Sequence, residues 1–325
     1  MTTSPTPVTP AIVLCPGQGA QSVGMARAWL ESSQAAREVF AHADRQLGAR
    51  LGGTLSDLCT NAPAEVLSRT DVSQPAIFTT SIACWRTLLA KRSMNDAEHP
   101  LAGAAGLSLG EYTALVIAGS VSFGDALELV TLRGRAMQDA AESHDAAAGG
   151  GGGMLALVGA TDAQAHEICD AAREKDVLVC ANFNAPGQVV LSGHKDALAR
   201  AQKVAESMGL RAQMLQVAGA FHSPLMSPAA DRLARALAGT PFTPPRCPVV
   251  SNVTAEPHDA TDASPDTIRV RLVEQLTSPV RWSQSCAWKA QNLRGDFVEL
   301  APGRTLAGLF RRINRDVKVT SHDTP

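Results

Sequence analysis

The sequence predicts an α/β fold, in which a small subdomain is inserted into a large domain with a parallel central sheet. Strand-like apolar runs stand at residues 11–15, 101–105, 248–253 and 296–300, and long helical patterns separate them, as in sheets whose strands are joined by crossover helices. Between the second and third runs, residues 140–217 follow a βαββαβ order of their own, which is typical of a ferredoxin-like subdomain.

The composition is that of an ordinary globular protein. The 325 residues are 45% hydrophobic and 18% charged, enough for one large domain or two ordinary ones. The net charge of −2 and the lack of a basic stretch argue against binding to nucleic acid or anionic membranes, and no apolar run approaches the length of a membrane-spanning helix. The seven cysteines include no C-x-x-C pair, which indicates reduced thiols in a cytoplasmic protein.

The chain opens with a segment rich in Thr and Pro, followed by the first strand. This segment has no Lys or Arg and no apolar core, so it predicts a disordered tail and not a signal peptide. The strand ends at residues 16–21, PGQGAQ, and helical patterns follow at residues 26–40 and 75–89. The expected domains are residues 1–10 as a tail, 11–139 with 218–325 as the large domain, and 140–217 as the inserted subdomain.

Ser108 lies in a tight turn between the strand at residues 101–105 and a helix at residues 112–118. In a G-x-S-x-G turn of this kind, the glycines make room for a sharp bend that holds the serine hydroxyl clear of the sheet. The hydroxyl also lies near free N–H groups at a helix N-terminus, which stabilise an oxyanion. The turn therefore predicts a serine nucleophile in an α/β-hydrolase-like domain, although the same pattern also occurs in plain Gly-rich loops.

The next helix carries an arginine on its apolar face. Residues 122–125 fit a capping box, and an apolar stripe runs from Ala126 to Met137. Arg133 is three or four residues from members of this stripe and points along it, whereas Arg135 lies on the polar side. A guanidinium on a buried face needs a carboxylate or several carbonyl groups around it.

The inserted subdomain begins with a low-complexity segment. Residues 146–153 contain five consecutive glycines, 149–153, and predict a flexible loop. Beyond it, apolar and amphipathic patterns alternate regularly, and one more helix is expected in the large domain at residues 305–313. The strands of the subdomain are expected at residues 154–158, 177–182, 188–192 and 211–217, and its helices at residues 163–173 and 195–208.

The loop at residues 16–21 has more than one possible function. It follows a strand and precedes a helix, as a dinucleotide-binding loop does, but its G-x-G-x-x-x-x-G spacing departs from G-x-G-x-x-G. We favour a turn that presents backbone N–H groups to an oxyanion. A merely structural turn, or a non-catalytic binding module built on this loop, are the alternatives.

His222 is the best candidate for a general base among eight histidines. Most of the others lie in polar surroundings, whereas His222 lies in an apolar segment directly after the inserted subdomain, where clefts form. The alternative is a core histidine without chemistry. No two histidines have metal-ligand spacing on a helix, so we expect no metal site.

Short motifs along most of the chain form one set. They are residues 16–21, 106–115, 132–134 with 137–138, 182–188 with 192–193, 219–226, 251–254, 275–276 with 279–282, and 299–303. Any one of them is weak evidence, but in this order the set resembles the malonyl-CoA:acyl carrier protein transacylases, the acyltransferase family of fatty-acid and polyketide synthesis. That family also contains an inserted ferredoxin-like subdomain.

The resemblance implies roles for the three main candidates. Ser108 would take the acyl group as an ester, and His222 would act as its general base. Arg133 would hold the malonyl carboxylate through two hydrogen bonds. This carboxylate would be the anion that a guanidinium on an apolar helix face needs.

The resemblance also implies supporting roles. The backbone N–H groups of Gln18 and Leu109 would form the oxyanion hole, and the backbone carbonyl of Gln275 would orient the histidine in place of a triad carboxylate. Phe221 resembles the aromatic residue of malonyl-selective members, because it would crowd a branched acyl group. Leu107 is a departure, since the family often has His before the serine; we expect catalysis to survive this change.

The implied activity is ping-pong transfer of malonyl from malonyl-CoA to the phosphopantetheine thiol of acyl carrier protein, for fatty-acid biosynthesis. It needs no cofactor, and we expect a monomer that binds neither nucleic acid nor membrane. A serine hydrolase or thioesterase is an alternative, and so is a trans-acting acyltransferase of a polyketide pathway. Arg281, Arg311 and Arg312 are candidates for contact with an acidic carrier.

Overall fold

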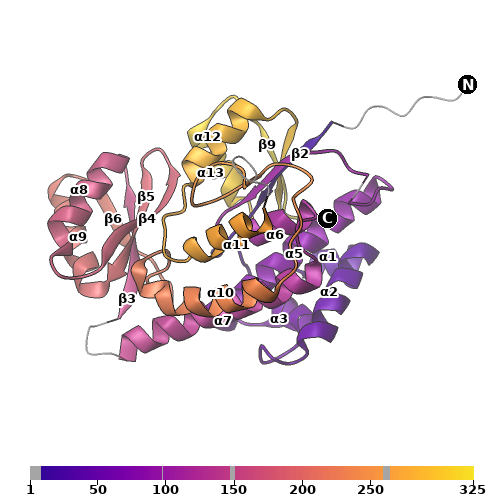
Figure 1. Cartoon of the computed structure of the whole chain (residues 1–325), viewed down its shortest axis with the longest axis horizontal. Coiled ribbons are helices and arrows are strands. Elements are labelled where there is room, and N and C mark those ends of the chain that lie inside the picture. The colour runs from indigo at the N-terminus through magenta and orange to yellow at the C-terminus, as the bar shows by residue number, and fades with distance from the viewer. Residues whose placement is uncertain (1–8, 97, 147–150, 259–263) are drawn as a thin grey trace, which may run out of the picture.

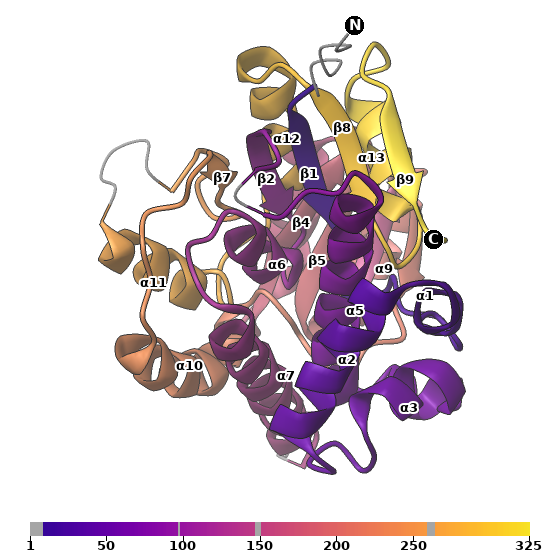
Figure 2. The same cartoon turned by 90° about the vertical axis from the view of Figure 1, so that its right-hand side faces the viewer.

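The computed structural model describes residues 9–96, 98–146, 151–258 and 264–325. The strands in these residues form two separate sheets. The larger sheet has the order β7-β2-β1-β8-β9, and every pair of neighbours in it is parallel (Figure 2). The predicted parallel central sheet is confirmed, whereas the closer likeness to α/β-hydrolases stays a prediction. The strands are β1 (Ala11–Cys15), β2 (Leu101–Gly106), β7 (Val249–Val250), β8 (Asp296–Leu300) and β9 (Val319–His322).

Helices cover both faces of this sheet, as the continuous apolar sequence of β1 requires. Val13 and Cys15 belong to the same apolar cluster as residues of α5 (Thr70–Lys91) and α6 (Gly110–Ile117). Ile12 and Leu14, which point to the opposite face, belong to a cluster with residues of α12 (Trp282–Asn292) and α13 (Thr305–Ile313). The central strand is thus buried on both sides.

The helical part of the large domain differs from the prediction in two places. The pattern at residues 26–40 is two helices, because Ser33 is extended (φ −127°, ψ 121°) and its hydroxyl accepts a hydrogen bond from Ala36 N at 3.2 Å, which caps the second helix. The pattern at residues 75–89 is the longer helix α5, with Pro75 inside it. The helices not yet named are α1 (Arg27–Ser32), α2 (Gln34–Leu47), α3 (Leu55–Asn61), α4 (Ala64–Leu67), α7 (Phe123–Ala146), α10 (Ser227–Gly239), α11 (Pro265–Glu274) and the short 3₁₀ helix η1 (Pro224–Met226).

Close packing against α7 explains the early start of α5. The first turn of α5 is buried, and a Cβ at Gly134 of α7 would lie only 2.6 Å from the Thr70 carbonyl oxygen. Proline is unfavourable inside a helix, because it removes one backbone hydrogen bond. The burial of residues 70–74 between helices offsets that loss. The predicted start of this helix at residue 75 was therefore wrong.

The smaller sheet is antiparallel with the order β4-β5-β3-β6. With its two helices it lies at one end of the molecule (Figure 1). The elements follow one another along the chain as βαββαβ, in the order predicted. They are β3 (Gly152–Val158), α8 (Asp162–Arg173), β4 (Leu178–Ala185), β5 (Gln188–His194), α9 (Lys195–Ser207) and β6 (Arg211–Met214).

The start of the inserted segment differs from the predicted one. Helix α7 continues through residue 140 to Ala146, and residues 147–150 of the predicted loop lie outside the described residues. Gly152 and Gly153, expected in that loop, instead belong to β3 and pair with β5. Gly152 also lies so close to Ala220 that a Cβ there would be 2.9 Å from the alanine Cβ. These two glycines therefore serve close packing.

Main-chain hydrogen bonds join the smaller sheet to a segment of the large domain. Val280 N donates to the Ala181 carbonyl (2.8 Å), and Phe183 N donates to the Val280 carbonyl (2.9 Å), so β4 is bridged to the segment before α12. In the large sheet, the strand predicted at residues 248–253 has only two residues, 249–250, because the chain then turns towards the serine. Of the predicted tail, residues 1–8 lie outside the described residues. None of the helices in the described part of the chain could span a membrane.

Candidate active site

The turn around Ser108 has the strained geometry that its sequence predicts. Strand β2 ends at Gly106, α6 begins at Gly110, and Ser108 between them has φ 51°, a conformation that a non-glycine residue adopts only when its surroundings impose it. A Cβ at Gly106 would overlap the backbone of Gly110, and one at Gly110 would overlap the Cys15 carbonyl. Both glycines are therefore required, and the serine is held at the N-terminus of α6.

His222 makes the contacts of a general base for Ser108. Its Nδ1 donates to the Gln275 carbonyl oxygen at 2.7 Å, and since a carbonyl only accepts, Nδ1 carries the hydrogen. Its Nε2 is then free to accept from Ser108 Oγ, which lies 2.9 Å away. Burial, followed by the positive charge of Arg133, lowers the pKa of His222 to about 4, so the imidazole is neutral at physiological pH.

Arg133 is buried beside the serine, and its hydrogen-bond partners are neutral. Its Nη1 donates to Gln74 Oε1 (2.7 Å), and its Nη2 donates to Gln275 Oε1 (2.8 Å) and Ser108 Oγ (2.9 Å). The side chain is 1% exposed, its Nε–H has no acceptor, and no carboxylate of the described residues lies within ion-pair distance. Because arginine stays protonated, it is a buried positive charge to which the described residues offer no directly paired counter-ion.

The backbone N–H groups of Gln18 and Leu109 lie in the turns expected of them. A Cβ at Gly17 would overlap the Leu107 carbonyl, so the loop of residues 16–21 is packed directly against the turn of the serine. Neither N–H donates to an acceptor among the described residues, which leaves both groups available to an oxyanion. Leu107, the unusual residue, is half-buried and packs against the apolar cluster of α12 and α13, so an apolar side chain suits this position.

A buried polar network that the sequence did not predict holds the turn of the serine in place. Asn252 accepts from Ser108 N (2.6 Å) and donates to the carbonyl at the end of β2 (2.7 Å). Glu111 accepts from Asn252 N (3.0 Å), His258 Nε2 (2.7 Å) and Gln275 Nε2 (2.7 Å). The Gln275 amide therefore links the carboxylate of Glu111 to Arg133, while its backbone carbonyl orients the histidine.

A cavity of about 380 Å³ opens onto these groups between the two sheets. Gln18, Ser108, Arg133, Phe221 and His222 line it, so the structure brings together five of the seven predicted site residues in one wall. The other two, Leu109 and Gln275, adjoin the serine and the histidine through the backbone. Further lining comes from Met137 of α7, Asn182 and Asn184 of β4, Gln188 of β5 and Leu309 of α13.

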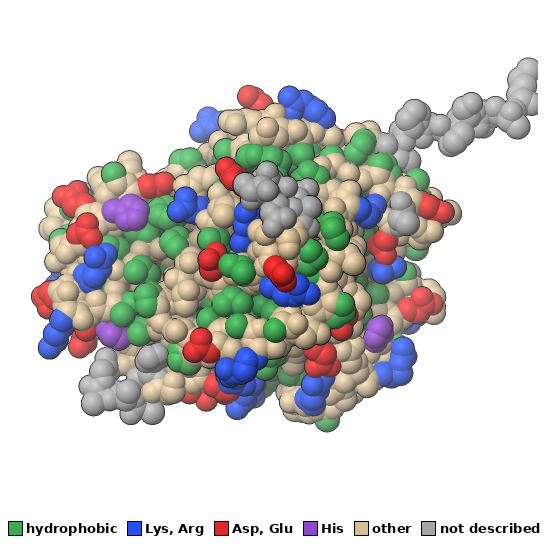
Figure 3. Space-filling view, viewed as in Figure 1, with side chains coloured by type: hydrophobic (Ala, Val, Ile, Leu, Met, Phe, Trp, Pro, Cys, Tyr) green, Lys and Arg blue, Asp and Glu red, His purple; other side chains and the backbone are tan. Residues whose placement is uncertain are grey.

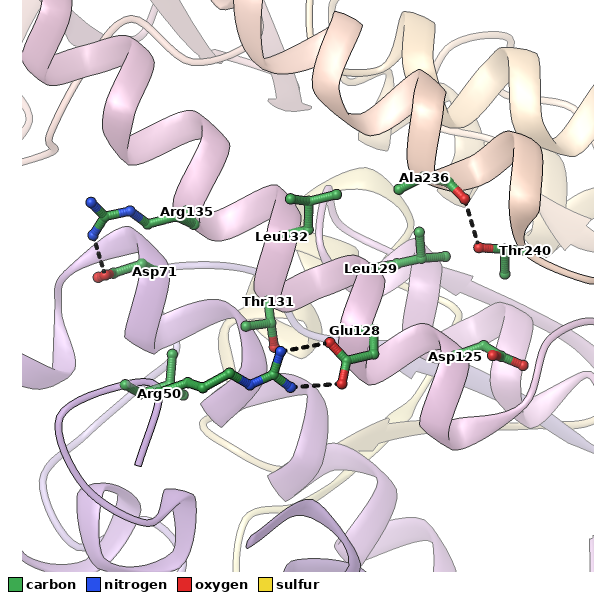
Figure 4. A pocket seen from close by; sticks show the side chains of 11 residues that line it. Arg50, Asp71, Asp125, Glu128, Leu129, Thr131, Leu132, Arg135, Ala236 and Thr240 are labelled. Atoms are coloured by element: carbon green, nitrogen blue, oxygen red, sulfur yellow. Dashed lines mark hydrogen bonds and ion pairs between the residues drawn. The ribbon is translucent and has the colours of Figure 1, made fainter. Parts of the chain in front are cut away.

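A second hollow, of about 610 Å³, lies between α7, α10 and the segment after α2, and Figure 4 shows its lining. Four of its charged groups form ion pairs, Arg50 with Glu128 at 2.6 Å and Arg135 with Asp71 at 3.4 Å, and Asp125 accepts from the Ser122 hydroxyl. Its threonine hydroxyls donate to carbonyls of their own helices. Because its polar groups already have partners, we assign no chemistry to this hollow. The predicted exposure of Arg135 is confirmed.

Comparison with known proteins gives one answer over almost the whole chain. The family described as acyl transferase domain matches residues 12–321. The malonyl CoA-acyl carrier protein transacylase of Salmonella typhimurium is 42% identical over 299 residues, which are 92% of this chain and 91% of the relative. The enzyme of that name from Bacillus subtilis is 37% identical over 96% of this chain and 93% of its own length.

Solved structures of similar sequence share the fold. The acyl-carrier-protein S-malonyltransferase of Bartonella henselae aligns with a TM-score of 0.88 at 37% identity, covering 97% of this chain and 96% of that one. A malonyl-transacylase in complex with its type II PKS acyl-carrier protein aligns with a TM-score of 0.87 at 34% identity, again over 97% and 96% of the two chains.

Proposed function

The chain belongs to the acyl transferase family, and from that premise we propose that it transfers malonyl from malonyl-CoA to acyl carrier protein through an ester on Ser108. The observation that carries the proposal is the buried guanidinium of Arg133, whose Nη2 lies 2.9 Å from the serine oxygen. A simple acyl ester gives this charge nothing to bind. A malonyl group bears a second carboxylate, and this carboxylate would supply the absent counter-ion.

In the first half-reaction, Ser108 attacks the thioester carbonyl of malonyl-CoA while His222 Nε2 takes the hydroxyl proton. The N–H groups of Gln18 and Leu109 stabilise the oxyanion of the tetrahedral intermediate. Its collapse breaks the carbon–sulfur bond, and His222 returns the proton to the sulfur of the departing CoA. Arg133 holds the malonyl carboxylate through Nε–H, which has no acceptor among the described residues, and through the Nη2–H that donates to Ser108 Oγ before the serine is acylated.

In the second half-reaction, the phosphopantetheine thiol of the carrier protein attacks the malonyl ester. His222 takes the thiol proton and then protonates Ser108 Oγ as the ester bond breaks, so the free enzyme returns. Both steps exchange one acyl bond for another, and neither calls for a cofactor. Water must be kept from the ester between the steps, and the largely apolar walls of the cavity, with Met137, Phe221 and Leu309 among them, support this.

Acyl carrier protein is the partner named for the relatives of this chain. We propose that it docks near two exposed arginines of α13. Arg312 is exposed at the end of α13 and donates to Gln188 Oε1 at 3.0 Å, and Gln188 lines the cavity. Arg311 is its exposed neighbour, so the two arginines lie near the cavity, where an acidic carrier would approach. Arg281 is also exposed, but no contact ties it to the cavity. The face of the molecule shown in Figure 3 mixes both signs of charge. We propose that the protein works as a monomer.

Trapping the covalent intermediate tests the proposal. The protein is mixed with malonyl-CoA, and the malonyl ester is located by peptide mass; we expect it on Ser108 and expect none in Ser108→Ala. CoA release is then measured with and without carrier protein. A transferase releases about one CoA per enzyme until carrier is added. Sustained release at full rate without carrier would instead establish the hydrolase alternative.

A further inference from the structure

Gln74 is a buried polar residue of α5 that no sequence motif pointed to. Its Oε1 accepts from Arg133 Nη1 at 2.7 Å, and its Nε2 lies 3.3 Å from Met137 Sδ, to which it donates. The side chain is 0% exposed. The guanidinium donor fixes the orientation of the amide, since the reverse orientation would set two donors against each other.

We propose that Gln74 is a specificity-determining positioning residue: it anchors Arg133 through a neutral acceptor, so that the full positive charge stays available to an anionic acyl group. The proposal rests on the transfer of malonyl described above. Gln74 binds Nη1, so the Nε–H without an acceptor and the Nη2–H that faces Ser108 Oγ stay available to an acyl group on the serine. Gln74 acts through Arg133, since its side chain forms no hydrogen bond with Ser108 or His222 among the described residues.

All the groups that accept hydrogen bonds from this arginine are uncharged. The second anchor, Gln275 Oε1 at 2.8 Å, is also an amide oxygen. The carboxylate of Glu111 is nearby, but its oxygens accept from Asn252, His258 and Gln275 and form no ion pair with Arg133. The remaining neighbour is the ring of Tyr112, whose centroid lies 5.7 Å from Arg133 Cζ. Uncharged groups thus position the guanidinium without cancelling its charge.

A carboxylate in place of the Gln74 amide would reverse this arrangement. Glutamate has nearly the same shape as glutamine, so its oxygen would lie at the same 2.7 Å from Nη1. It would form a permanent ion pair with Arg133 and repel the malonyl carboxylate. An uncharged acyl group would meet no such repulsion. Gln74→Glu is therefore expected to change the choice of acyl donor and not merely the rate.

The test compares kcat/KM for malonyl-CoA and acetyl-CoA in Gln74→Glu, Gln74→Met and the wild type. In Gln74→Glu, the malonyl-to-acetyl ratio is expected to fall about 100-fold, mainly through KM for malonyl-CoA. Gln74→Met is the matched control, because it removes the acceptor and leaves the charge uncompensated. Its ratio is expected to fall only about threefold to tenfold, because Arg133 is less well positioned but keeps its full charge.

Two outcomes would overturn the inference. One is a Gln74→Glu variant that is folded by circular dichroism and has the same malonyl-to-acetyl ratio of kcat/KM as the wild type. The other is a fall of this ratio in Gln74→Met that is as large as the fall expected for Gln74→Glu. If only Gln74→Met folds, its malonyl-to-acetyl ratio is the test, and a fall of about 100-fold overturns the inference. Malonyl loading of the wild type is measured in the same experiment. If the wild type forms no malonyl-serine, the proposed function itself fails, whereas normal loading with an unaltered ratio refutes the role of Gln74 alone.

Discussion

Lys289 on α12 is buried without a hydrogen-bond partner, so its replacement by methionine should stabilise the protein. Its side chain is 0% exposed, its Nζ has no acceptor among the described residues, and Nζ lies over the ring of Trp282, 4.6 Å from the centroid. Burial lowers the pKa of Lys289 from its ordinary 10.5, and the nearby thiols of Cys286 and Cys15 offset this only in part. Methionine is of similar length and has no group that needs a partner.

The size of the effect follows from the amine that methionine removes. A buried polar group without a hydrogen bond costs about 1–3 kcal/mol, so Lys289→Met should raise the free energy of unfolding by about that amount at pH 7. An entropy of unfolding of about 2.1 cal/mol/K per residue, over 325 residues, makes 1 kcal/mol equal to about 1.5 °C in Tm. The expected increase in Tm is therefore about 1.5–4.5 °C.

The pH dependence identifies the cause. With a folded pKa below 10.5, the unfolded chain binds a proton that the folded protein releases, so wild-type stability rises with pH up to about 10.5. The variant lacks this contribution, and its advantage in urea unfolding should shrink as the pH rises from the folded pKa of Lys289 towards 10.5. Burial also raises the pKa of Cys286 to about 11, so that thiol stays protonated in this range. A less stable variant, or an advantage independent of pH, would refute the reasoning.

Four further predictions concern the site. Arg133→Ala should lose about 2–4 kcal/mol of transition-state binding for malonyl-CoA, which lowers kcat/KM roughly 30-fold to 10³-fold, while kcat/KM for acetyl-CoA stays unchanged. An equal loss for both donors in steady-state assays would exclude the carboxylate contact. Because the pKa of His222 is lowered to about 4, the base form is present above that value, and kcat/KM should be level from about pH 5 to 7 and fall only near pH 4; a midpoint near 6.5 would show an ordinary histidine. Arg133→Ala should shift this midpoint upward, since the guanidinium charge contributes to the lowering. Asn252→Ala leaves Ser108 N and the Gly106 carbonyl without their partner and should cost about 1–3 kcal/mol of stability, with kcat lowered more than KM raised; unchanged urea unfolding would contradict this support.

Local patterns in the sequence were sufficient to predict much of the site. The glycines at 106 and 110 predicted the turn of Ser108, and the apolar spacing around Arg133 predicted a buried guanidinium with an unmet need for an anion. His222 and Gln275 depended more on the family resemblance, because their contact joins segments 53 residues apart.

The residues that the sequence did not reveal are polar groups whose partners lie far along the chain. Glu111 and His258 are 147 residues apart, and no periodicity predicts such a pair. Gln74 could have been suspected, since it is an uncharged polar residue at the start of a long, largely apolar helix. The one strong error about α5, its start at Pro75, arose because close contact with α7 outweighs the local preference of proline.

Strand β8 lies beside β1, which it follows by 280 residues of sequence, and this pairing has a consequence for synthesis on the ribosome. Until residues 296–300 have emerged, the second edge of β1 has no neighbour, and a nascent chain carries an apolar strand open to wrong pairing. The supports of the serine are also translated late, Asn252 and Gln275 among them. An unfinished chain therefore lacks both a neighbour for β1 and the supports of Ser108, and we expect acylation only after these late segments have emerged.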